Sequence, residues 1–124
     1  MDKVKKLSIY AMGVAYAYVG IMHFVNPSFF MHIMPPYLPY HKELVYLSGL
    51  AEIFLGVTLI IPKTRRLAAW GIIALLIAVY PANLYLAFNE EPQQALQISS
   101  FAASWVRLPI QFILAAIAYW HTKP

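Results

Sequence analysis

Four long apolar runs constrain the fold of this chain more than any other feature of its sequence. They cover residues 7–25, 44–61, 67–88 and 98–120, and together they contain only two charged side chains, Glu52 and Arg107. Each run is close to the ~20 residues that an α-helix needs to cross a bilayer. None shows the alternation of barrel strands, so we expect four membrane-spanning helices.

The composition supports a membrane protein. Of the 124 residues, 61% are hydrophobic and 11% are charged, whereas soluble domains are nearer half apolar and a quarter charged. So small a soluble domain has too little interior to bury this apolar excess. We therefore exclude an ordinary soluble enzyme, a disordered tail and a nucleic-acid-binding module. The chain has no cysteine, which excludes disulfides, thiolate nucleophiles and cysteine-based metal sites.

We predict one domain over residues 1–124, an all-α integral membrane four-helix bundle. With four crossings, the start of the chain, the turn after the second run and the end of the chain lie on one side. These three places carry most of the basic residues, and basic loops favour the cytoplasmic side. We therefore predict a multi-pass protein of the bacterial plasma (inner) membrane with both termini cytoplasmic. The basic residues are Lys3, Lys5, Lys6, Lys63, Arg65, Arg66 and Lys123.

The first outer connection, residues 26–42, has an unusual sequence. Asn26 is a suitable helix cap and Pro27 suits the first helical position, while Pro35 and Pro36 would end the helix. Apolar residues recur between them at helical spacing. We predict a short interfacial helix that covers the mouth of the bundle; a plain hydrophobic loop is the alternative. Residues 89–97 are interpreted as a short polar loop.

The two intramembrane charges are expected to lie at the same depth. Glu52 and Arg107 are each roughly 13–15 Å below the outer end of their run, at ~1.5 Å per residue. A charge inside the membrane costs about 2.5–3.5 kcal/mol, so such groups face the bundle interior and find partners. We predict an ion pair between Glu52 and Arg107. The pair either only fixes helix register or belongs to a ligand or proton site.

Other polar residues are predicted to share this zone. Helical spacing places Ser104, Arg107 and Gln111 on one face of the fourth run. Pro81 and Pro109 remove backbone donors inside the third and fourth runs, which would widen the bundle toward its outer face. We predict an outer-half cavity whose buried polar residues are Glu52, Arg107, His23, Asn83, Tyr80, Gln111, Ser48 and Ser104.

Motifs for other chemistry are missing. His23, His32 and His41 are nine residues apart, which is no known metal-ligand spacing, so we predict no metal. We expect His121 to contact lipid headgroups. No Gly-rich phosphate loop or Ser-His-Asp arrangement is present, and the sequence identifies no catalytic residue.

Several motifs together resemble the DoxX-like family of small bacterial membrane proteins. The resemblance implies a four-helix bundle whose polar core includes the Glu52 region, Asn83 and the Arg107 region. Some relatives are associated with quinone-linked sulfur oxidation, some with thiol redox partners, and distant ones resemble receptor-assembly chaperones. The matching residues are Gly20-x-x-His23-Phe24, Ile33-Met34-Pro35-Pro36-Tyr37, Ser48-Gly49-x-x-Glu52, Thr64-Arg65-Arg66 and Pro81-Ala82-Asn83.

Three functions are compatible with these features. The preferred one is binding of an amphipathic lipophile (a quinone, isoprenoid or lipid) in the outer-half cavity, and the resemblance adds a redox association. The second is a non-catalytic assembly or chaperone partner of another membrane protein. The expected partners are the lipid bilayer, a lipophilic small molecule, and another membrane protein or a second copy of the chain in a homo-oligomer. The third is a membrane enzyme that uses Glu52 as acid or base.

Overall fold

The computed structural model describes residues 2–123, and all regular secondary structure within them is helical. Four helices are long and apolar enough to cross a membrane, and each overlaps one predicted run. The fourth begins as a π-helix, η1, and continues as α6. Two short helices, α2 and α5, lie in the connections. The bounds are α1 Lys3–Val25, α2 Pro27–Met31, α3 His41–Ile60, α4 Arg65–Phe88, α5 Glu90–Leu96, η1 Ala102–Val106 and α6 Arg107–His121.

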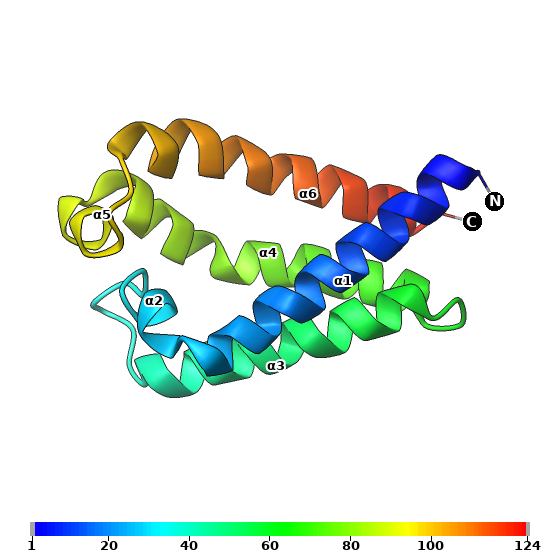
Figure 1. Ribbon diagram of the computed structural model, residues 1–124, viewed down its shortest axis with the longest axis horizontal. Helices are drawn as coiled ribbons and strands as arrows, with labels where there is room; N and C mark the ends of the chain where they lie inside the picture. The colour runs from blue at the N-terminus through cyan, green and yellow to red at the C-terminus, as the bar shows by residue number, and fades with distance from the viewer. Residues whose placement is uncertain (1, 124) are drawn as a thin grey trace.

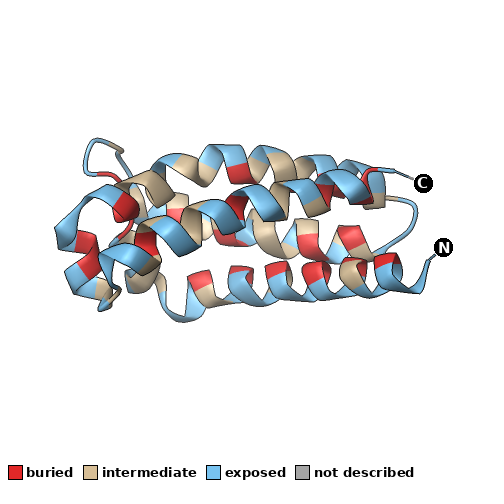
Figure 2. Ribbon diagram, turned by 90° about the horizontal axis from the view of Figure 1, so that it is seen from above, coloured by how far each residue is buried: buried red, intermediate tan, exposed pale blue. Residues whose placement is uncertain are grey.

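The four long helices run side by side and define two ends of the molecule. Both chain termini and the turn between α3 and α4 lie at one end, here called the terminal end (Figure 1). The helices α2 and α5 lie at the opposite end, here called the loop end (Figure 1). Residues turned toward neighbouring helices are buried, and the outward faces are exposed (Figure 2). Large apolar side chains cover those faces, including Val14, Tyr18, Phe54 and Phe112, as expected for a surface in contact with lipid.

The helices α1 and α3 form a close antiparallel pair because glycines face each other across it. A Cβ atom added to Gly56 would lie 2.5 Å from the carbonyl oxygen of Gly13. One added to Gly20 would lie 2.6 Å from the carbonyl oxygen of Gly49. Small residues at such positions let two helix backbones touch, which is how helices associate where lipid weakens the hydrophobic drive.

The apolar interior is divided into two clusters. The larger one fills the terminal half and includes Ile9, Leu59 and Ile72, all fully buried. The smaller one lies near the loop end and consists of Ile33, Leu86 and Ala103. The clusters close the bundle at its two ends and leave the space between them to the polar residues described below.

A polar clamp joins the first and last helices at the terminal end. The Oγ of Ser8 is 2.9 Å from Nε2 of His121, and Lys5 donates from Nζ to the carbonyl of Lys123 at 2.8 Å. His121 is only 1% exposed, so the expected headgroup contact is wrong. Toward the loop end α1 and α6 move apart (Figure 1). Hydrogen bonds therefore hold α1 and α6 together at the terminal end, whereas the two helices are apart at the loop end.

The polar segment 89–97 is a helix rather than a loop. Its residue Gln93 is buried and donates from Nε2 to the carbonyls of Leu86 at 2.8 Å and Ala87 at 3.1 Å. These carbonyls belong to the last turn of α4, where no backbone donor follows in the helix. The helix α5 thus folds back over α4, because Gln93 supplies hydrogen bonds to the free carbonyl groups at the end of α4.

Candidate functional site

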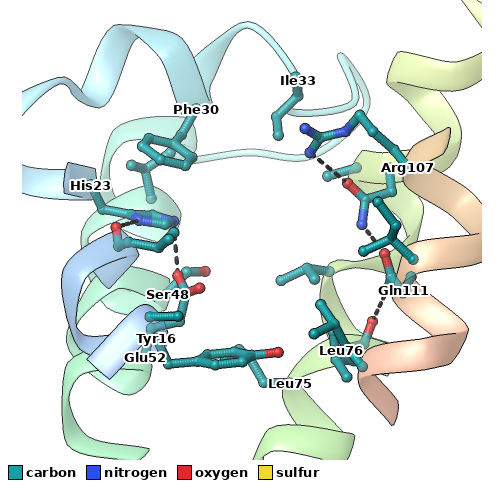
Figure 3. A pocket seen from close by; sticks show the side chains of 18 of the residues that line it. Tyr16, His23, Phe30, Ile33, Ser48, Glu52, Leu75, Leu76, Arg107 and Gln111 are labelled. Atoms are coloured by element: carbon teal, nitrogen blue, oxygen red, sulfur yellow. Dashed lines mark hydrogen bonds and ion pairs between the residues drawn. The ribbon is translucent and has the colours of Figure 1, made fainter. Parts of the chain in front are cut away.

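A cavity of about 400 Å³ lies between the two apolar clusters. One wall comes from α1 and α3 and the other from α4 and α6, while the segment that includes α2 covers the loop end (Figure 3). Most lining side chains are apolar. The polar and titratable ones are Tyr16, His23, Ser48, Glu52, Asn83, Arg107 and Gln111.

The α1–α3 wall carries a contact between His23 and Glu52. Nε2 of His23 lies 3.0 Å from Oε2 of Glu52, and Nδ1 of His23 lies 2.7 Å from the carbonyl oxygen of Val19. Helical side chains point toward the N-terminus of their own helix. Because α1 and α3 are antiparallel, the two side chains lean toward each other and meet.

These contacts fix the proton count of the pair. A carbonyl oxygen only accepts, so Nδ1 of His23 carries a proton and donates to Val19. The 3.0 Å contact between Nε2 and Oε2 then also needs a proton, because two lone pairs would otherwise face each other. Whether that proton sits on nitrogen or oxygen, the histidine and the carboxyl group together carry no net charge.

The α4–α6 wall carries a chain of side-chain hydrogen bonds. Gln111 donates from Nε2 to the carbonyl of Leu76 at 2.7 Å and accepts at Oε1 from Nδ2 of Asn83. Arg107 donates from Nη2 to Oδ1 of Asn83 over a long 3.4 Å. Among the described residues, nothing accepts from the buried Nε of Arg107. The guanidinium group is thus held by one neutral amide and is incompletely satisfied.

The predicted ion pair between Glu52 and Arg107 is wrong. The two side chains lie on opposite walls with the cavity between them (Figure 3). Glu52 contacts His23 because α1 packs directly on α3, and Arg107 contacts Asn83 because α6 packs on α4. The expectation of equal depth made a pair plausible, but depth alone does not decide which helices are neighbours.

Two of the predicted cavity residues, Ser104 and Tyr80, lie outside the cavity. Ser104 does not line it and donates from Oγ to the carbonyl of Ser100 at 2.7 Å. The cause is η1, because a π-helix has more residues per turn and breaks the three-and-four spacing on which the prediction depended. Tyr80 lines a separate hollow between α4 and α6, where its ring packs edge-on against Phe112 with centroids 6.0 Å apart.

The segment that follows α1 covers the cavity at the loop end. Phe30 of α2 stacks on His23 with ring centroids 3.7 Å apart, and Ile33 and Met34 also line the cavity. The predicted helix after Asn26 is present, with proline at its start. The Asn26 side chain does not cap it and instead accepts a hydrogen bond from the hydroxyl of Ser28 at 3.0 Å.

The sequence contained one signal for the His23–Glu52 contact that the prediction did not use. Glycines recur seven residues apart on α1, at Gly13 and Gly20, and again on α3, at Gly49 and Gly56. Two such small-residue stripes favour close packing of their helices. Pairing them antiparallel brings His23 beside α3, whereas no comparable stripe joins α3 to α6.

Loss of the Gln111 side-chain amide should weaken the α4–α6 wall. We expect Gln111→Leu to lower the free energy of unfolding by about 1–2 kcal/mol, because Asn83 and the Leu76 carbonyl each lose a partner. Denaturation in detergent micelles measures the change. The control is Ile113→Leu on the exposed face of the same helix, which should leave stability unchanged; equal stability of both variants would contradict the proposed bonding.

A family model described as "Domain of unknown function (DUF8561)" matches residues 12–122. No curated protein and no solved structure matches the chain significantly. The match covers α1 from residue 12 onward, the other three long helices in full and every residue that lines the cavity. The chain therefore belongs to the DUF8561 family.

Proposed function

We propose that this protein binds an amphipathic lipophile, such as a quinone, an isoprenoid or a lipid, in the cavity between its four long helices. The observation that supports this most is the arrangement of two polar groups on opposite walls of an otherwise apolar space of about 400 Å³. Ligand pockets are typically ~300–1,000 Å³, largely apolar, with a few placed polar groups.

The cavity has a side opening where lipid would lie. Val19 on α1 and Ile110 on α6 both line the cavity, yet their exposed fractions are 38% and 45%. Ala15, one turn from Val19, is also an exposed lining residue. Because α1 and α6 separate toward the loop end (Figure 1), a molecule dissolved in the membrane would enter between them without passing through water.

The proposed setting is a bacterial plasma membrane with the terminal end in the cytoplasm. The basic residues around both termini and the α3–α4 turn share that end, and the positive-inside rule favours it. The helix α2 would then lie at the outer interface and cover the ligand. The resemblance to the DoxX-like family favours a redox-associated ligand, such as a quinone.

A membrane enzyme is the second candidate, and the His23–Glu52 contact favours it. A histidine and a carboxyl group that share one proton beside a mostly apolar cavity form an acid–base pair. Glu52→Gln separates this candidate from simple binding, because the amide can still donate to Nε2 but cannot exchange a proton. Binding that survives while turnover of a bound lipophile is lost would indicate the enzyme.

Native mass spectrometry of gently extracted protein tests the binding proposal. We expect a retained lipophile, and a rise in the thermal unfolding midpoint when the matching quinone, isoprenoid or lipid is added to stripped protein. Ala15→Trp should block the side opening and reduce both effects. Ala11→Trp, one turn away on the exposed face and outside the cavity lining, should not. Stripped protein whose midpoint no lipophile raises would overturn the proposal.

A further inference from the structure

We infer that the lipophile carries an anionic head group and that Arg107 binds it. This inference rests on the proposed function and specifies its ligand class. It follows from the charges around the cavity, from the unfilled hydrogen-bonding capacity of the guanidinium group, and from the position of that group relative to the apolar walls.

The cavity carries one uncompensated positive charge. Glu52 is the only carboxylate among the residues that line it, and its contact with His23 leaves that pair without net charge. Arg107 keeps its charge under all ordinary conditions. Arg107 is partly removed from water, with its Nε buried, and an unpaired charge in such a position is costly, so the site as built favours a ligand that brings a negative charge.

The guanidinium group also has free donors. Its bond to Asn83 is long, at 3.4 Å from Nη2 to Oδ1, and the buried Nε has no acceptor among the described residues. Five donors in a planar fork match the oxygens of a carboxylate or a phosphate group, which an arginine binds through two parallel bonds. A neutral carbonyl or hydroxyl oxygen would accept from fewer of the Arg107 donors and would not neutralise the positive charge.

The apolar walls lie on the terminal side of Arg107. The guanidinium group is near Ile33 at the loop end of the cavity, and Leu75 and Leu76 lie toward its other end (Figure 3). Leu114, about two helical turns from Arg107 on α6, extends the same apolar wall. A head group at Arg107 therefore places a hydrocarbon chain along these side chains or out through the opening between α1 and α6.

Matched single-chain probes test the inference. Protein stripped of lipid and held in a nonionic detergent is titrated with palmitate, hexadecyl phosphate and hexadecanol, and binding is measured by calorimetry. We expect the two anions to bind at least about tenfold more tightly than the alcohol, because a charged hydrogen bond contributes more than a neutral one. The ratio between palmitate and hexadecyl phosphate then tells a carboxylate ligand from a phosphate ligand.

Two variants locate the effect. Arg107→Gln can still donate to Asn83, and it should remove the preference for anions, so that the three probes bind with similar affinity. Arg66→Gln removes an exposed charge at the opposite end of the molecule, and it should keep the preference. If Arg107→Gln does not fold, the comparison of the three probes on the unaltered protein still decides.

The possible results separate the inference from the proposal beneath it. Equal binding of hexadecanol and the anions overturns the anionic ligand but supports a lipophile site. An anion preference that survives in Arg107→Gln overturns the assignment to Arg107. If none of the three probes binds and the quinone, isoprenoid and lipid tests are also negative, both the inference and the proposed function fail.

Discussion

Gly56→Ala is expected to destabilise the protein by about 1–3 kcal/mol, the usual range for overpacking, although alanine is the better helix former. The added methyl group would lie 2.5 Å from the carbonyl oxygen of Gly13 and 2.7 Å from the backbone nitrogen of Ala17. Backbone atoms of a helix cannot rotate away as a side chain can. The helices α1 and α3 would have to separate, and the His23–Glu52 contact between them would lengthen.

The control for this variant is Gly71→Ala. There the new methyl group would lie 2.6 Å from Cδ2 of Leu55, the far end of a flexible side chain, which can move at little cost. Both variants gain the same ~1 kcal/mol of intrinsic helix propensity, so their difference isolates the backbone clash. Thermal or denaturant unfolding in detergent micelles measures it. The close packing of α1 on α3 would be refuted if Gly56→Ala were as stable as Gly71→Ala.

Breaking the contact between His23 and Glu52 is the second change with a large expected effect. Each single variant, His23→Leu or Glu52→Leu, should lose about 2 kcal/mol, because the remaining partner keeps a polar atom without its bond in a mostly apolar wall. The double variant should lose less than the sum of the two, since neither polar group is then left alone. A double-mutant cycle should give a coupling energy of about 1–2 kcal/mol.

Arg107 supplies the control for this cycle. Pairing Glu52→Leu with Arg107→Leu should give effects that add within about 0.5 kcal/mol, because the two side chains face each other across the cavity rather than touch. A coupling energy between Glu52 and Arg107 as large as that between Glu52 and His23 would contradict the observed arrangement. It would support the Glu52–Arg107 ion pair that was expected from the sequence.

The helices were predictable because their cause is local. A run of about 20 apolar residues must become a helix in lipid whatever surrounds it, since its backbone has no other donors and acceptors there. Each predicted run accordingly overlaps one long helix. The start of the short helix after Asn26 was also predictable, because Pro27 begins it. Its end was not, because α2 stops at Met31, before Pro35. The helix α5 was not, since its position depends on bonds from Gln93 to the end of α4.

The cavity residues were predictable only in part. Depth and helical spacing indicated Glu52, Arg107, His23, Asn83, Gln111 and Ser48, and all six line the cavity. The same spacing failed for Ser104, because it assumed an α-helix across η1. It also failed for Tyr80, which the rotation of α4 turns toward Phe112. Helical spacing relates the residues of one helix to each other but does not say which neighbour they face.

The sequence by itself determined the four long helices, their capacity to cross a membrane and six of the polar residues that line the cavity, because hydropathy and helical period act within each segment. Only the tertiary structure decided that Glu52 meets His23 and that Arg107 meets Asn83. That choice depends on how closely two backbones approach, and the glycines of α1 and α3 allow an approach that α3 and α6 do not share. The cavity, and the charge left at Arg107 beside it, follow from that difference in packing.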